Sequence, residues 1–198
     1  MRNLKDDEFQ QIVAETNGVI FTEEIVKRGI ERGSLSKYID DGRLIRAYRG
    51  VYITPGTVLD KCFILQRGYG RGIFSHRSAL YLNGLLDVEP EIHVMTFPRG
   101  YNPRSPEDRG VEVKRIIPEL YEMGVMDIET PMGHIVKSYG PERALCDVLR
   151  GSKPPERDIE EAFRRYKARP EANIDLLKEL SRPLHVEKRL ERMLNIIG

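Results

Sequence analysis

The stretch GVIFTEEIVKRGIERGSLSKYIDDGRLIRAYRGVYI, residues 18–53, decides the expected fold of the N-terminal part of the chain. Thr22 is a good N-cap for a short helix that continues through Lys27, with two glutamates at its positive end. A further helix is predicted from about residue 32 to residue 41, where Gly42 provides a stop signal. These signals predict two short helices in close succession.

The elements on either side complete the pattern. An amphipathic helix at 5–16 precedes the stretch, and two short strands at 44–47 and 51–53 close it. In the last helix, Leu35 and Ile39 are expected to face the core. Three helices followed by a ribbon, in about fifty residues, is the order of a winged helix-turn-helix.

Basic side chains concentrate in this stretch, although the net charge of the whole chain is only +1. Between Lys27 and Arg49 there are seven Lys or Arg against three acids. In a winged helix-turn-helix the third helix enters the major groove, and Arg, Lys and Ser there suit phosphate or base contacts. The alternatives are a solvated ribbon or a protein-interaction module. The residues expected to contact DNA are Arg32, Ser34, Ser36, Lys37, Arg43, Arg46 and Arg49.

The remainder of the chain predicts an α+β fold, with a mixed α/β domain after the winged helix-turn-helix and a helical C-terminal tail. A Pro-Gly break at 54–57 predicts a boundary between domains 1–56 and 57–198. The sequence GSKPPER predicts a second break, with the helical tail from about residue 152. The predicted helices are 58–67, 75–83 and 141–149, and the predicted strands are 91–97, 111–116, 127–129 and 134–137.

Composition indicates a folded, soluble protein of the cytoplasm. Hydrophobic residues make up 40% of the chain and charged residues 32%. No stretch approaches the roughly 18 consecutive apolar residues of a membrane span, and the N-terminus lacks the apolar segment of a secretory signal. Cys62 and Cys146 lack paired-ligand spacing, so they are expected to be reduced core thiols.

Three motifs resemble those of AbiEi-type antitoxins. GRLIRAYRGVY, residues 42–52, is similar to the family's Gly-x-Leu-x-Arg-x-x-x-Gly-Val-Tyr. FSHRSALYLNGLLD, residues 74–87, is similar to its Ser-His-x-Ser-Ala stretch followed by Gly-Leu. GHIVKSYGPERALCDVLR, residues 133–150, is similar to its strand followed by a Glu-Arg-x-Leu-x-Asp helix. The resemblance spans about residues 15–150, with one departure, Ala144, where many relatives have Thr.

This resemblance implies a two-domain transcriptional repressor that is the antitoxin of a type IV toxin–antitoxin operon associated with phage defence. It implies that the winged helix binds double-stranded DNA, at inverted repeats in its own promoter. It also implies that the C-terminal domain counteracts a nucleotidyltransferase-like toxin, directly or indirectly. The function expected is therefore that of a DNA-binding autorepressor and antitoxin, not of an enzyme, with no cofactor and no metal.

Two groups of residues raise the alternative of an enzyme. Ser75 and His76, near Ser78, could act as nucleophile and base with Asp147, but no nucleophile elbow surrounds Ser75. We expect Ser75 to be a helix N-cap instead. Glu112 and Lys114, in VEVK, resemble half of a metal-dependent nuclease site that needs a further carboxylate. The strand pattern there predicts that both side chains are exposed to solvent.

Other polar residues are weaker candidates. The histidines lie at 76, 93, 134 and 185, without the short spacings of a zinc site. Arg143 and Asp147, four residues apart, are expected to form an ion pair on one helix. The loop FPRGYNPRSPEDRG is either a contact for DNA or toxin or only a surface hairpin. Its arginines are Arg99, Arg104 and Arg109.

Overall fold

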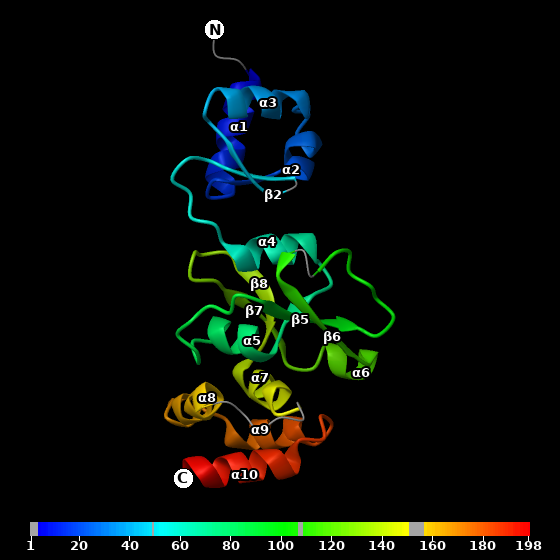
Figure 1. The fold of residues 1–198 in the computed structure, drawn as a ribbon, viewed down its shortest axis with the longest axis vertical. Helices are drawn as coiled ribbons and strands as arrows, with labels where there is room; N and C mark the ends of the chain where they lie inside the picture. The colour runs from blue at the N-terminus through cyan, green and yellow to red at the C-terminus, as the bar shows by residue number, and fades with distance from the viewer. Residues whose placement is uncertain (1–3, 49, 107–108, 151–156) are drawn as a thin grey trace. The chain divides into compact units, whose positions relative to one another are not determined.

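The computed structural model describes residues 4–48, 50–106, 109–150 and 157–198. The chain divides into two compact units, Met1–Lys61 and Cys62–Gly198 (Figure 1). Hydrophobic residues form one buried cluster in the first unit and two in the second. Arg49 and the predicted start of the helical tail near residue 152 lie outside the described residues.

The N-terminal unit is a winged helix-turn-helix, which confirms the predicted order of helices and ribbon. Its three strands form one antiparallel sheet in the order β1-β3-β2. The strand β1 was not predicted. The elements are α1 (Leu4–Glu15), β1 (Val19–Phe21), α2 (Thr22–Lys27), α3 (Gly33–Asp40), β2 (Ile45–Tyr48) and β3 (Val51–Ile53).

Thr22 connects the second helix to the wing. The predicted N-cap role differs from the structure, where Phe21 occupies the N-cap and Thr22 is the first residue of α2. The backbone N–H of Thr22 donates to the carbonyl of Gly50 at 3.0 Å, and its hydroxyl donates to the same oxygen at 3.3 Å. The turn between β2 and β3 is therefore fixed to the start of α2.

The core of this unit shows that the predicted inward position of Ile39 is wrong. Leu35 is buried as expected, but Ile39 is 36% exposed and Tyr38 is buried in its place. The Tyr38 ring stacks on Phe9 of α1, with ring centroids 4.0 Å apart. Positions three and four residues from Leu35 both reach one side of a helix, and the aromatic partner on α1 favours the first of them.

Arg43 covers the stack of Phe9 and Tyr38. Its guanidinium carbon lies 4.9 Å from the Phe9 ring centroid and 4.7 Å from the Tyr38 centroid. Its Nη1 also donates to Asp6 Oδ1 at 2.7 Å. One side chain thus joins the segment after α3 to α1 by cation–π and ionic contacts.

The predicted linker at 54–57 packs on the turn between α1 and β1. Gly18 has φ +81°, and a Cβ atom there would lie 2.3 Å from Thr57 Oγ1 and 2.5 Å from Thr54 Oγ1. The Thr54 N–H donates to the Gly18 carbonyl at 3.0 Å, and the two threonine hydroxyls lie 2.7 Å apart. Both the backbone angle and the close approach require glycine at this position.

The C-terminal unit is built on a mixed five-stranded sheet in the order β6-β5-β4-β8-β7. The pairs β5–β6 and β4–β8 are parallel, and β4–β5 and β7–β8 are antiparallel. The strands are β4 (Ile73–Phe74), β5 (His93–Pro98), β6 (Val111–Ile116), β7 (Val125–Glu129) and β8 (Ile135–Tyr139). The helices are α4 (Lys61–Gly68), α5 (His76–Leu82), α6 (Pro118–Tyr121), α7 (Pro141–Val148), α8 (Arg157–Lys167), α9 (Ile174–Ser181) and α10 (Glu187–Ile197).

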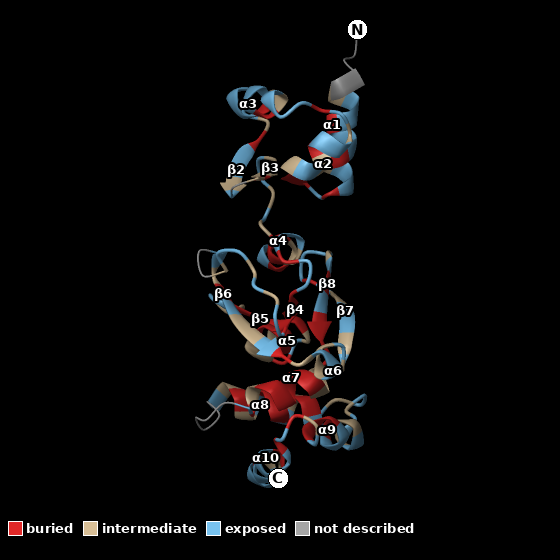
Figure 2. Ribbon diagram, turned by 90° about the vertical axis from the view of Figure 1, so that its right-hand side faces the viewer, coloured by how far each residue is buried: buried red, intermediate tan, exposed pale blue. Residues whose placement is uncertain are grey.

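The described part of this unit has two buried clusters, and α5 contributes to both. Residues of α4 pack with one set of strand residues, including Phe74 and Phe97. Residues of α5 and α7 share another cluster with the tail helices, through Ile159, Phe163 and Leu177. These three tail residues are buried, and Figure 2 shows burial concentrated on α7 and the central strands. In the part of the chain that the structure describes, no helix has the length and apolarity to cross a membrane.

The contact at Gly18 predicts a specific loss of stability. Gly18→Ala forces a non-glycine residue to positive φ and into Thr57, and we expect it to lower the unfolding free energy by roughly 2–3 kcal/mol. Urea unfolding followed by circular dichroism measures this change. Gly29→Ala is the matched control, because Gly29 has φ +75° but a Cβ there meets nothing within 4 Å. If both variants lost the same unfolding free energy, the close contact with Thr57 would make no contribution to stability.

The position of Arg43 predicts that it stabilises the N-terminal unit. Arg43→Ala removes the contacts with Asp6, Phe9 and Tyr38, and we expect a loss of about 1–2 kcal/mol of unfolding free energy. Urea unfolding provides the measurement, with Arg46→Ala as the control because Arg46 is exposed on β2. A larger loss from Arg46→Ala than from Arg43→Ala would contradict this assignment.

Candidate nucleic-acid interface

The candidate DNA-binding residues of α3 and the wing lie on the surface of the N-terminal unit. Arg32 is the N-cap residue of α3, and Ser36 and Lys37 lie on its exposed side. Ser34 is half-buried, and Arg46 is exposed on the edge strand β2. The local fold therefore presents donors from both a helix and a ribbon, which are the two elements that a winged helix-turn-helix uses on DNA.

The basic residues of this unit divide into two groups by their partners. Arg28 forms an ion pair with Glu15, and Arg43 forms one with Asp6. Within the described ranges, Arg32, Lys37 and Arg46 form no ion pair. A cation that is exposed and not neutralised by the protein is available to a phosphate.

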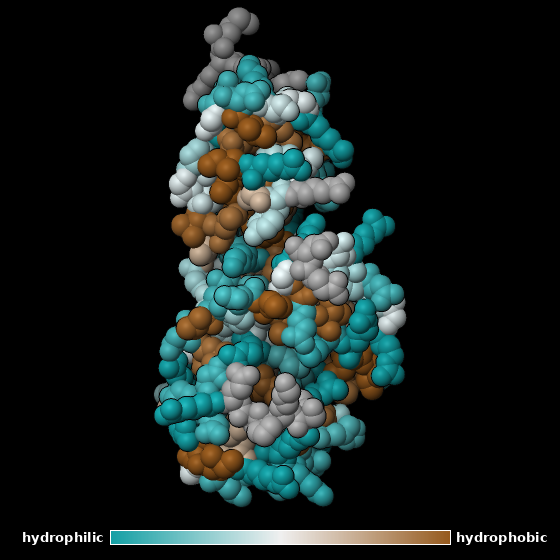
Figure 3. Space-filling view, viewed as in Figure 1, coloured by the Kyte–Doolittle hydropathy of each residue, from teal (hydrophilic) through white to brown (hydrophobic). Residues whose placement is uncertain are grey.

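Apolar side chains accompany the basic ones on the wing, which sequence reasoning missed. Ile45 and Tyr48, both on β2, are 51% and 43% exposed. Figure 3 shows hydrophobic and hydrophilic side chains side by side on the viewed face of the N-terminal unit. The sequence shows that both residues are apolar. In a short edge strand, however, it does not show which side chains face the core and which face solvent. Exposed apolar groups beside cations suit contact with sugars and thymine methyl groups.

The second arginine-rich candidate lies on the C-terminal unit. Arg99, Arg104 and Arg109 are all exposed. The Tyr69 hydroxyl is 3.0 Å from the carbonyls of both Arg104 and Ser105, and the Arg109 guanidinium lies 5.6 Å from the Tyr69 ring centroid. Tyr69 thus anchors the described part of this loop to the domain.

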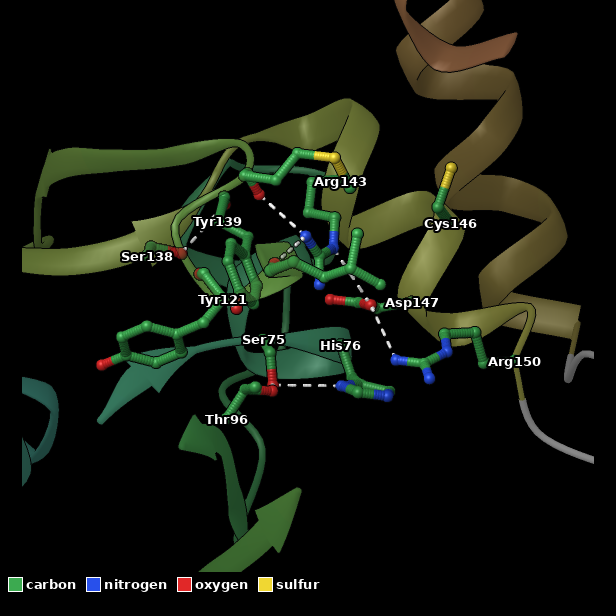
Figure 4. A network of polar contacts seen from close by, with 12 residues as sticks. Ser75, His76, Thr96, Tyr121, Ser138, Tyr139, Arg143, Cys146, Asp147 and Arg150 are labelled. Atoms are coloured by element: carbon green, nitrogen blue, oxygen red, sulfur yellow. Dashed lines mark hydrogen bonds and ion pairs between the residues drawn. The ribbon is translucent and has the colours of Figure 1, made fainter. Parts of the chain in front are cut away.

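A polar network in the same unit joins two of the sequence motifs (Figure 4). Arg143 and Asp147, each 1% exposed, form the predicted ion pair, with Nε 3.2 Å from Oδ1. Arg150 approaches the same carboxylate oxygen at 3.9 Å. Burial raises the pKa of Asp147, and the charge and hydrogen bond of Arg143 partly offset that shift. The pair is an interior structural feature of α7.

Ser75 and His76 belong to the same network but do not form an accessible nucleophile. Ser75 occupies the N-cap of α5 as predicted, yet its hydroxyl makes no capping bond. It accepts from Thr96 Oγ1 at 2.8 Å and lies 3.0 Å from His76 Nδ1. Burial, reinforced by the charges of Lys114, Arg150 and Arg143, lowers the pKa of His76 to about 3. Since Ser75 is fully buried, a substrate has no access to its hydroxyl.

Glu112 and Lys114 lie on β6 as the strand pattern predicted. The Glu112 side chain is exposed and that of Lys114 is partly exposed, and Lys114 Nζ is 2.6 Å from Glu112 Oε1. Among the described residues, Glu112 belongs to no converging group of three side chains that could hold a metal ion. Among the described residues, the arrangement of Glu112 and Lys114 is that of a surface ion pair.

Comparison with known proteins agrees with the fold. The RV2827C protein from Mycobacterium tuberculosis, a solved crystal structure, superposes with a TM-score of 0.56 at 17% identity. The alignment covers 94% of this chain and 78% of that chain, so the two proteins share a fold. No curated protein matches the sequence.

A family model matches the N-terminal unit. It is described as a transcriptional regulator and AbiEi antitoxin, and the match covers residues 10–55. The matched segment contains α2, α3 and both strands of the wing. Residues 10–55 are therefore similar to a domain of the AbiEi antitoxin family of transcriptional regulators.

Proposed function

We propose that the protein is a DNA-binding autorepressor and the antitoxin of a type IV toxin–antitoxin operon. The observation that carries the proposal is the exposure of Arg32, Lys37 and Arg46 on the segment that matches the AbiEi regulator family. We propose that α3 enters the major groove of double-stranded DNA and that β2 contacts the adjacent backbone. The inverted repeats of its own promoter are the proposed target.

The proposed DNA contacts have unequal roles. Arg32, Lys37 and Arg46 lack ion pairs among the described residues, so they are the proposed phosphate or base contacts, with Ser34 and Ser36 as hydrogen-bond donors. Arg43 already contacts Asp6, and its proposed contribution to DNA binding is to hold the wing in place. Arg49, which lies outside the described residues, is proposed as a further contact from its place in the ribbon sequence.

We propose that the two domains divide the work near residue 56. Residues 57–198 then counteract a nucleotidyltransferase-like toxin, directly or indirectly, with Arg99, Arg104 and Arg109 as candidate contacts. We propose a cytoplasmic location, a role in phage defence, and no catalytic activity. The burial of Ser75 and the ion pair between Glu112 and Lys114 support the last of these.

The interface predicts which cations control DNA affinity. Arg32→Ala, Lys37→Ala and Arg46→Ala should each weaken binding to the DNA upstream of the gene, and each lost phosphate contact should lower the slope of log K against log salt by about 1. A variant that loses a base contact should also lose roughly 1–3 kcal/mol of preference for that DNA over random DNA. Fluorescence anisotropy at several salt concentrations measures both effects.

Lys178→Ala is the matched control for these variants, because Lys178 is exposed on α9 and its removal changes the net charge equally. It should leave affinity and salt slope unchanged. If the three variants behave like Lys178→Ala while circular dichroism shows a folded protein, the proposed interface is wrong.

The division of work predicts that DNA binding and protection from the toxin separate in the full chain. The triple variant Arg32→Ala, Lys37→Ala, Arg46→Ala should derepress a reporter under its promoter and still protect cells from the toxin expressed from an unrelated promoter. Colony counts with and without toxin induction give the readout. Loss of protection at normal protein levels would show that the N-terminal domain takes part in neutralisation.

A further inference from the structure

Cys62, Glu89 and His93 converge in the C-terminal unit from three different segments. Cys62 is the second residue of α4, and His93 is the first residue of β5. Glu89 lies in the connection between α5 and β5. One ligand atom from each of the three side chains lies within 4.8 Å of the other two. The proposed function uses none of these residues.

The spacing of the three side chains is close to that of ligands around one ion. His93 Nδ1 lies 3.9 Å from Cys62 Sγ, and His93 Nε2 lies 3.2 Å from Glu89 Oε1. Zinc bonds of about 2.0–2.3 Å in a tetrahedral site place neighbouring ligand atoms about 3.3–3.8 Å apart. The two observed separations lie within about 0.1 Å of this range, one above it at Nδ1 and one below it at Nε2 of the His93 ring.

The Cys62 and His93 side chains are fixed by their buried surroundings, whereas the partly exposed Glu89 side chain has room to move. Cys62 is 2% exposed and His93 is 1% exposed, and the His93 ring packs edge-on against Phe74 with ring centroids 5.8 Å apart. The Glu89 side chain is 35% exposed. Because one ion takes one nitrogen of an imidazole, binding requires a small movement of one ligand, and Glu89 is the side chain with room to make it.

We propose that Cys62, Glu89 and His93 form a site for a divalent transition metal of the zinc class, with a fourth position open to water on the Glu89 side. Thiolate and imidazole ligands favour zinc over magnesium or calcium, which prefer oxygen. On binding, the Cys62 thiol releases its proton to solvent while its sulfur bonds to the ion, so affinity rises with pH. The bound ion connects α4 to the segment that leads into β5.

Cobalt(II) is a suitable probe because it takes zinc sites and absorbs light. One equivalent of CoCl2 added to the chelator-treated full-length protein should produce a near-ultraviolet sulfur-to-cobalt charge-transfer band and the visible bands of tetrahedral cobalt. Cys62→Ser should abolish the charge-transfer band. Glu89→Gln, at a partly exposed position, should keep the band but bind at least tenfold more weakly.

Cys146→Ser is the matched control. Cys146 is also buried, but its thiol donates to the Leu177 carbonyl at 3.6 Å, and burial raises its pKa to about 12. This variant should retain the full cobalt spectrum. Zinc should displace cobalt and raise the melting temperature of the wild type and of Cys146→Ser by several degrees, but not that of Cys62→Ser.

Three outcomes would overturn the proposal. The first is a wild-type protein without a sulfur-to-cobalt band, and the second is a band that persists in Cys62→Ser. The third is Glu89→Gln with wild-type affinity, which would remove the carboxylate from the site. Circular dichroism shows whether each variant is folded. If Cys62→Ser does not fold, Glu89→Gln still tests the proposal.

Discussion

The burial of one guanidinium sets the arrangement of the C-terminal unit. Arg143 is 1% exposed, and a buried cation is stable only with partners on most of its donors. Its Nη1 donates to the carbonyls of Leu120 and Met123 at 2.9 and 2.8 Å, and its Nε donates to Asp147. The ring of Tyr139 lies 4.2 Å from its guanidinium carbon. Arg143 therefore fixes three segments relative to one another: the turn after α6, the end of β8 and the helix α7.

This constraint leaves the apolar residues of α7 free to pack in one core. Its ion pair occupies the polar interior, so the other residues of the helix are available to pack with α5 and the tail. Ala144, Leu145 and Cys146 are all fully buried in the cluster that the tail helices share. Ala144 needs no hydrogen-bond partner in this apolar setting.

The sequence predicted most of the fold, because helix periodicity and glycine or proline signals depend on neighbouring residues. The α+β class, the order of helices and ribbon, and most strands of the sheet are confirmed. The elements that were not predicted, β1, β4 and α6, are three, two and four residues long. The error at Ile39 arose because the phase of α3 depends on Phe9, which lies far away in sequence. Cys62 and His93 meet only through the topology of the sheet, so their spacing gave no signal.

Contacts between residues far apart in sequence also determine how much positive charge the candidate interface offers to DNA. The arginines of the basic stretch look equivalent in sequence, but Arg28 and Arg43 find acidic partners outside it, at Glu15 and Asp6. The electrostatic term in DNA affinity comes from protein cations that neutralise phosphates and so release the counterions condensed on the DNA. A cation already paired within the protein adds less to that term. The charge available to DNA is therefore smaller than the local excess counted from the sequence, and it rests on the residues that the fold leaves exposed without an ion pair.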